Sequence, residues 1–263
     1  MTTTIAVAGK GGTGKTTVAG LLIRYLSERK HGSILAIDAD PSSNLNYVLG
    51  MEVEETIGDI REDMLDQVQT SSALAGSMPG GMSKQDYLDY QIQMAVVESD
   101  SVDLLAMGRP EGPGCYCAAN QMMRVIMDRM GNNYDYVVMD NEAGMEHISR
   151  RTTRDVDYLL LVTDLSQRGL IAAQRIVEMV PGLDVNIGKL YLIVNRVMDQ
   201  LPTVFNDALA KLDVTLIGTI PNDPVMAEFE FMGRPLVQLP HDTQVVKAVY
   251  QIADKIFANG HKM

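Results

Sequence analysis

The chain has 263 residues, with 34 acidic and 22 basic side chains and a formal net charge of −12. General charge attraction to DNA or to an anionic membrane requires clustered Lys and Arg, so the acidic balance argues against both partners. The apolar run near the N-terminus is short, and nowhere do about 18 apolar residues follow one another, so neither a signal peptide nor a membrane span is expected. We expect a cytoplasmic protein with one large α/β domain over residues 1–263.

A glycine-rich stretch, GKGGTGKTT at residues 9–17, follows an apolar run and precedes a helical pattern. This strand, loop and helix have the G-x-x-x-x-G-K-[ST] spacing of a phosphate-binding P-loop. Its glycines let backbone N–H groups face phosphate oxygens, and the helix N-terminus adds partial positive charge. Lys15 would reach the β- and γ-phosphates, and the Thr16 hydroxyl would hold Mg²⁺. The predicted nucleotide-binding residues are Gly9, Gly11, Gly12, Thr13, Gly14, Lys15, Thr16 and Thr17.

Lys10 places a second lysine inside the loop. The pattern K-G-G-x-G-K-T-T from Lys10 to Thr17 resembles that of the deviant P-loop ATPases, the group of MinD, ParA, ArsA and the nitrogenase iron protein. In that group the early lysine crosses the interface of an ATP-sandwiched dimer and touches the partner's nucleotide. The resemblance implies that Lys10 does the same, so that ATP holds two subunits together and hydrolysis releases them.

Residues 33–38 are apolar on both faces and are predicted to form a buried parallel strand. The strand ends at Asp38 and Asp40, on the edge where open α/β sheets place ligands. This D-x-D-P segment resembles switch I of the group, which implies that Asp40 positions the attacking water and Asp38 supports the Mg²⁺ shell. The alternative for Asp40 is a cap on the next helix.

Residues 45–100 form an acidic segment that we expect to fold as peripheral helices and loops, variable within the family. We assign no chemistry to this segment. Recognition of a client protein by it is a hypothesis.

Two cysteines, Cys115 and Cys117, follow a predicted strand at 102–107 and a loop rich in Gly and Pro. They precede a helical pattern, and a helix N-terminus lowers a thiol's pKa and favours the metal-binding thiolate. One C-x-C gives two sulfurs, whereas a two-fold dimer gives four, enough for Zn²⁺, Ni²⁺ or an iron–sulfur cluster. A reactive dithiol without metal and two incidental cysteines remain alternatives.

The stretch P-E-G-P-G-C-Y-C, in a chain with this P-loop, resembles the CooC/AcsF branch of the group. ATPases of that branch take part in inserting nickel into carbon monoxide dehydrogenase and acetyl-CoA synthase. The resemblance implies that Cys115 and Cys117 bind Ni²⁺, or Zn²⁺, between the subunits, and that the client is one of those two enzymes.

A further buried strand at 134–140 ends at Asp140, which matches the acid that holds Mg²⁺ through water in P-loop NTPases. The residues that follow resemble switch II, which implies that the Gly144 amide contacts the γ-phosphate. His147 could be a metal ligand or a partner contact, but a surface histidine is favoured.

Asn195 and Arg196 end another predicted strand and resemble the N-R pair that contacts the base in this group. A guanine site would carry N-K-x-D, so adenine is preferred. Pro221 and Asp223 resemble the second adenine-side loop of the group, and helix capping by Asn222 or Asp223 is the alternative.

The alternation of strands and helices predicts a doubly wound, mostly parallel sheet with helices on both faces, of the P-loop NTPase type. The amphipathic closing helix at 243–257 is expected to dock on the sheet, because it has too few basic residues to hold a membrane. The predicted function is a dimeric, Mg²⁺-dependent ATP/ADP switch that helps load nickel, with no nucleic acid or membrane partner. Two alternatives remain, a carrier of a bridging iron–sulfur cluster and a ParA- or MinD-like positioning switch.

Overall fold

The computed structural model describes residues 2–30, 32–70, 82–109, 127, 130–142, 155–183 and 185–258. Cys115, Cys117, Gly144 and His147 lie outside these residues, so their assigned roles remain predictions.

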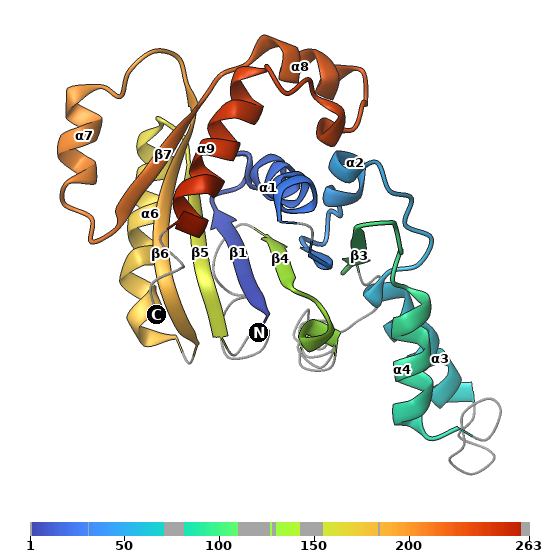
Figure 1. Ribbon diagram of the computed structural model, residues 1–263. Helices are drawn as coiled ribbons and strands as arrows, with labels where there is room; N and C mark the ends of the chain where they lie inside the picture. Colours follow the sequence, from blue (N-terminus) through green and yellow to red (C-terminus); the bar gives the residue numbers. More distant parts are fainter. Residues whose placement is uncertain are drawn as a thin grey trace.

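Seven parallel strands form one sheet in the order β3-β2-β4-β1-β5-β6-β7 (Figure 1). This order confirms the predicted doubly wound sheet, because β1 lies in the middle and the chain extends the sheet in both directions. The strands are β1 (Thr3–Gly9), β2 (Ile34–Ala39), β3 (Val102–Ala106), β4 (Tyr136–Asn141), β5 (Asp155–Thr163), β6 (Asn186–Val197) and β7 (Thr215–Pro221).

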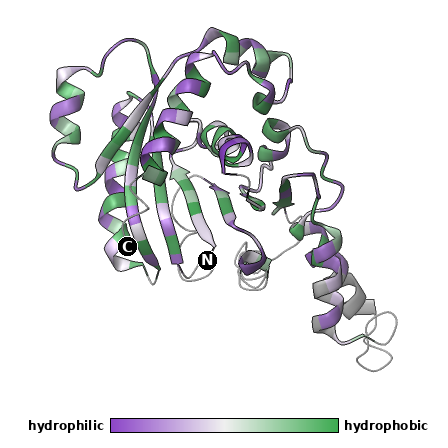
Figure 2. Ribbon diagram, viewed as in Figure 1, coloured by the Kyte–Doolittle hydropathy of each residue, from purple (hydrophilic) through white to green (hydrophobic). Residues whose placement is uncertain are grey.

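Helices cover both faces of this sheet. Successive strand residues point to opposite faces, so Ile5 and Val7 join one core cluster while Ala6 and Ala8 join the other. Figures 1 and 2 show the apolar strands between α1 and α9 on one face and α6 on the other. The helices are α1 (Lys15–Arg29), α2 (Leu45–Leu49), α3 (Ile57–Thr70), α4 (Lys84–Met94), α6 (Gln167–Met179), α7 (Thr203–Leu209), α8 (Pro224–Phe231) and α9 (Gln244–Ala258), with 3₁₀ turns η3 (Gly131–Asn133), η4 (Val180–Gly182) and η5 (Leu236–Gln238).

The closing helix α9 docks on the protein, as predicted. Its apolar face is buried against β7 and α1, and the Tyr25 hydroxyl donates to Asp254 at 2.6 Å. Among the described residues, none of the helices combines the length and the apolarity needed to cross a membrane. The short helices α7 and α8 were not predicted, because each is only about two turns long and carries no long apolar period.

The described parts of the acidic segment contain helices, and α3 and α4 lie side by side and project from the sheet (Figure 1). The Ser83 hydroxyl accepts a hydrogen bond from the Asp86 amide at 3.1 Å and caps α4. The base of the pair is fixed because its apolar residues are buried in the core, namely Ile57, Ile60, Ile92 and Ala95. We call residues 57–94, where described, the arm.

Candidate nucleotide site

The sheet brings the predicted site residues to one edge. The P-loop follows β1, and its neighbours in the sheet end nearby, with Asp38 and Asp140 paired in register across β2 and β4. Asn195 lies near the end of β6 on the same edge. Since the carboxyl ends of parallel strands meet where open α/β sheets bind ligands, this edge is the candidate site.

The P-loop backbone has a form that requires glycine. Gly9 has φ +148° and lies so close to β5 that a Cβ atom would meet the carbonyl oxygen of Val162. Gly14, at φ +91°, is the residue before α1, and a Cβ there would meet the side-chain amide of Asn195. Gly12 has φ +80° with nothing within 4 Å of its Cβ position. The loop is therefore held at both ends and open in its middle, as a phosphate cradle requires.

Asn195 ties the loop to β6. Its buried side-chain Nδ2 donates to the carbonyl oxygen of Thr13 at 2.8 Å, and its Oδ1 accepts from the amide of Arg196 at 2.8 Å. The Thr13 hydroxyl in turn donates to the carbonyl oxygen of Lys10 at 2.8 Å. The sequence analysis assigned Asn195 to the base and missed this loop-supporting role, for which one sequence carries no signal. Arg196 is exposed and stands at φ +58°.

Asp38 organises the segment after β2. Its carboxylate is fully buried and accepts from the amides of Asp40 at 3.1 Å and Leu45 at 2.9 Å. The amide of Leu45 begins α2, so Asp38, and not Asp40, caps that helix. Asp40 is half-buried, and its Oδ1 accepts from the Ser42 amide at 2.9 Å, which fixes a tight turn at the predicted water-positioning residue.

Asp140 is the best candidate for a cation ligand. Among the described residues, its buried Oδ1 has no hydrogen-bond partner. Burial raises the pKa of Asp140 to about 7, although a hydrogen bond from Thr16 and the charge of Lys15 oppose this rise. Burial likewise raises the pKa of Asp38 to about 6, against the backbone hydrogen bonds from Leu45 and Asp40.

Mg²⁺ fits this arrangement. An unpartnered carboxylate oxygen beside a hydroxyl is a hard oxygen donor set, and Mg²⁺ commonly uses one or two such protein ligands together with substrate phosphates and water. In the described ranges, no three His, Cys, Asp or Glu side chains are grouped to hold a metal without such help. Thr16 and Asp140 would hold the ion, with Asp38 supporting the loop beside them.

The raised pKa values predict an unusual pH dependence of stability without metal. A folded-state pKa above the unfolded value means that the folded chain binds more protons, so the free energy of unfolding falls as pH rises from about 4 to 7. Asp140→Asn should make the metal-free protein more stable at pH 8 by about 1–2 kcal/mol, with little gain at pH 5. Urea unfolding in EDTA at both pH values measures this, and an equal effect at both would contradict the assignment.

The two lysines of the loop have different surroundings. Lys15 is buried at the start of α1. Lys10 is half-buried, and its positive charge acts on Asp164 of the same chain. Burial would raise the pKa of Asp164, but hydrogen bonds from Ser166 and the charge of Lys10 outweigh it and lower that pKa. The single chain therefore offers Lys10 an acidic neighbour of its own.

On the predicted adenine side, Asp223 has a structural role. Its carboxylate accepts from the amide of Val225 at 2.9 Å and from that of Val245 at 3.1 Å. It therefore caps α8 and holds the start of α9, as the capping alternative proposed. Base contacts through the backbone of Pro221 and Asp223 stay predictions.

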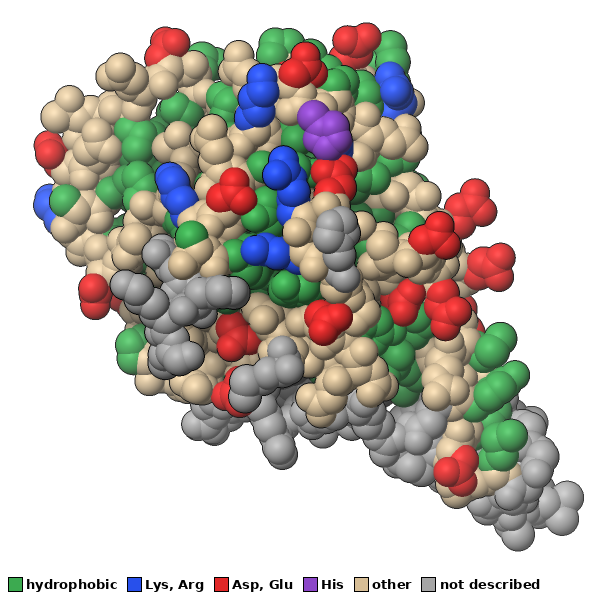
Figure 3. Space-filling view, viewed as in Figure 1, with side chains coloured by type: hydrophobic (Ala, Val, Ile, Leu, Met, Phe, Trp, Pro, Cys, Tyr) green, Lys and Arg blue, Asp and Glu red, His purple; other side chains and the backbone are tan. Residues whose placement is uncertain are grey.

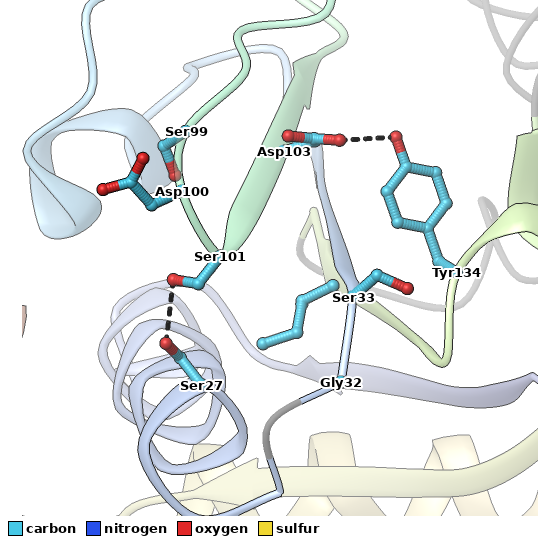
Figure 4. A pocket seen from close by; sticks show the side chains of 9 residues that line it. Ser27, Gly32, Ser33, Ser99, Asp100, Ser101, Asp103 and Tyr134 are labelled. Carbon is cyan, nitrogen blue, oxygen red and sulfur yellow. Dashed lines mark hydrogen bonds between the residues drawn. The ribbon is translucent and has the colours of Figure 1, made fainter.

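A cavity of about 450 Å³ lies at the opposite edge of the sheet, where β2 and β3 begin (Figure 4). Its polar side chains bond to one another: Ser27 Oγ donates to Ser101 Oγ at 2.8 Å, and the Tyr134 hydroxyl donates to Asp103 at 2.7 Å. Because the P-loop stands at the other ends of the strands, this cavity is not part of the nucleotide site.

Comparison with known proteins agrees with the geometry. A family described as the CobQ/CobB/MinD/ParA nucleotide binding domain matches residues 4–236. The chain is 45% identical to an uncharacterized ATP-binding protein of Methanocaldococcus jannaschii, covering 96% of this chain and 97% of that one. It is 30% identical to the carbon monoxide dehydrogenase accessory protein CooC of Rhodospirillum rubrum, covering 87% of each. Its fold is similar to that of the septum site-determining protein MinD of Pyrococcus horikoshii, solved with Mg-ADP, with a TM-score of 0.70, 22% identity, and coverage of 99% of this chain and 98% of that one.

Proposed function

The chain belongs to the CobQ/CobB/MinD/ParA family of nucleotide-binding domains, and on that premise we propose that it is a nickel-loading ATPase. In this proposal it works as a Mg-ATP-hydrolysing homodimer, binds nickel through Cys115 and Cys117, and assists nickel insertion into carbon monoxide dehydrogenase or acetyl-CoA synthase. The unpartnered Asp140 oxygen beside Thr16, behind a glycine-dependent P-loop, carries the ATP-hydrolysing part.

The residues of the nucleotide site have distinct roles in the proposed hydrolysis. Lys15 and the loop amides bind the phosphates, and Mg²⁺ on Thr16 and Asp140 would neutralise the charge that develops between the β- and γ-phosphates. Asp40 orients the attacking water from its fixed turn. Lys10 leaves Asp164 to reach the partner's nucleotide, so that dimerisation completes the site. The Gly144 amide reports the presence of the γ-phosphate.

The nickel part rests on the C-x-C motif and on the CooC relative. Two thiolates per subunit complete a four-sulfur site only across a two-fold axis, which makes metal binding depend on the dimer. The connection to the cysteines begins at Met107, whose amide donates to the carbonyl oxygen of Asp38 at 2.8 Å. Asp38 at the nucleotide edge is thus hydrogen-bonded to the start of the chain segment that contains Cys115 and Cys117.

A second candidate, a ParA- or MinD-like positioning switch, is supported by the fold and opposed by the net charge of −12. A third candidate, an iron–sulfur carrier, would differ from both because the anaerobically purified protein would absorb visible light.

Anaerobic titration with Ni²⁺ and Zn²⁺ of the wild type and of a Cys115→Ser/Cys117→Ser variant tests the proposal. The expected result is one metal per dimer in the wild type and none in the variant, with metal affinity that differs between ADP and a non-hydrolysable ATP analogue. The variant should still bind nucleotide, which is its control for folding. If neither protein binds metal while ATP still drives dimerisation, the nickel proposal is wrong and the positioning switch replaces it.

A further inference from the structure

The exposed face of α4 carries apolar side chains where a solvated helix would carry polar ones. Met82, just before α4, and Tyr90 and Met94 within it are 40%, 49% and 60% exposed. Asp86, Tyr90 and Met94 lie four residues apart and so share one side of α4, and Met82 precedes the N-cap Ser83. We call Met82, Tyr90 and Met94 the α4 stripe. Single exposed apolar residues are ordinary, but three within 13 residues of a projecting element indicate a contact surface.

Acidic side chains gather where the arm joins the body. Glu52, Glu54, Asp59 and Asp63 are exposed there, and we call them the acidic root. Burial and the charges of Asp63 and Asp59 raise the pKa of the neighbouring Glu55, which shows how closely these acids stand. Figure 3 shows these two kinds of surface on one side of the molecule, acidic side chains at the root and hydrophobic ones along the arm.

The sequence between residues 45 and 100 offers little positive charge to balance this surface. Its only basic residues are Arg61, which is half-buried, and Lys84. The acids of this segment are Glu52, Glu54, Glu55, Asp59, Glu62, Asp63, Asp66, Asp86, Asp89, Glu98 and Asp100. A partner that approaches the arm therefore meets a negative potential around an apolar strip.

The arm is also firmly connected to the nucleotide edge. The amide of Gly58, in the first turn of α3, donates to the carbonyl oxygen of Met107 at 2.8 Å, and the Met107 amide donates to Asp38 at 2.8 Å. Gly108 lies against Thr56, since a Cβ atom there would meet the Thr56 side chain. The base of α3 is thus hydrogen-bonded to Met107, at the start of the segment that leads to the cysteines, and Met107 is in turn hydrogen-bonded to the end of β2.

We propose that the arm is the docking surface for the nickel-accepting client, and that the client presents Lys or Arg side chains around an apolar projection. This inference rests on the proposed function. An apolar centre with charged surroundings is the usual arrangement of a protein contact, in which the apolar residues supply affinity and the charges supply orientation and association rate. A second copy of this chain is disfavoured as the occupant, because acidic roots would face each other.

Binding of immobilised nickel-free carbon monoxide dehydrogenase, and separately of nickel-free acetyl-CoA synthase, tests the arm. The apolar variant is Tyr90→Ser/Met94→Ser, and the charge variant is Glu54→Lys/Asp63→Lys. Asp59 is left intact because its carboxylate accepts from the Thr56 amide at 2.9 Å and orders the start of α3. The matched control is Met198→Ser/Val204→Ser, since these residues are 80% and 81% exposed near α7, away from the arm.

The wild type and the control should bind the same one of the two enzymes with equal affinity. Each arm variant should bind that enzyme with an affinity at least about tenfold lower. The loss in the charge variant should shrink at high salt, whereas the loss in the apolar variant should persist. Circular dichroism melts establish that all variants fold.

Equal binding by every variant would overturn the arm assignment and leave the nickel proposal standing. If the wild type binds neither enzyme, the client is wrong and the arm assignment fails with it. Self-association that the arm variants weaken would make a second copy the occupant, which also overturns the assignment.

Discussion

Lys15→Ala should lower the rate of ATP hydrolysis by about 10²–10³-fold or more and strongly weaken nucleotide binding by the single chain. Lys15 is the only buried lysine among the described residues, and it stands at the first turn of α1 behind the glycine loop. Its positive charge lowers the pKa of Asp140 against the effect of burial, so the lysine acts electrostatically on the predicted Mg²⁺ ligand. Phosphate release and calorimetric titration with ADP measure the two effects.

Lys10→Ala is the matched variant, because it removes the same charge from the same loop. Lys10 is only half-buried and has Asp164 as its acidic neighbour, so it is not needed to bind nucleotide within one subunit. The variant should bind ADP like the wild type, yet fail to dimerise with ATP in sedimentation experiments and hydrolyse ATP slowly. If both variants lose ADP binding equally, Lys10 acts within its own subunit and the crossing role is wrong.

The sequence predicted those parts of the fold that short patterns encode. Each strand was visible because parallel strands buried on both faces are continuous apolar runs, and the P-loop was visible because its glycines follow from backbone geometry. Strands β1, β2, β3, β4 and β6 were predicted from such runs, and α1 and α9 from their helical patterns. The order of the strands was not predicted beyond the doubly wound arrangement, in which β1 lies at the centre and the chain extends the sheet in both directions.

Contacts between distant residues were not predictable in the same way. The hydrogen bond from Asn195 to Thr13 spans 182 positions, and nothing near either residue indicates it. Asp38 was assigned to the Mg²⁺ shell, but its hydrogen bonds to Asp40 and Leu45 depend on how the chain turns after β2. The acidic segment was expected at the periphery, with client recognition as a hypothesis, but the α4 stripe had no meaning until α4 was known to project from the sheet.

Gly9→Ala should destabilise the protein by about 3 kcal/mol or more, because two costs add at one position. Alanine strongly disfavours φ +148°, and the added methyl group would meet the carbonyl oxygen of Val162. That carbonyl belongs to β5, which pairs with β1 at this point, so neither strand can move aside without breaking the centre of the sheet.

Two other glycines separate these costs. Gly12→Ala, at φ +80° with nothing within 4 Å, should cost only the backbone strain of about 1–2 kcal/mol. Gly182→Ala meets nothing and has no positive φ, so it should change stability by less than about 0.5 kcal/mol. Urea unfolding of the three variants measures the series. A Gly9→Ala protein as stable as Gly12→Ala would mean that β5 yields to the methyl group, and the close approach of the P-loop to β5 would then not explain why glycine begins the loop.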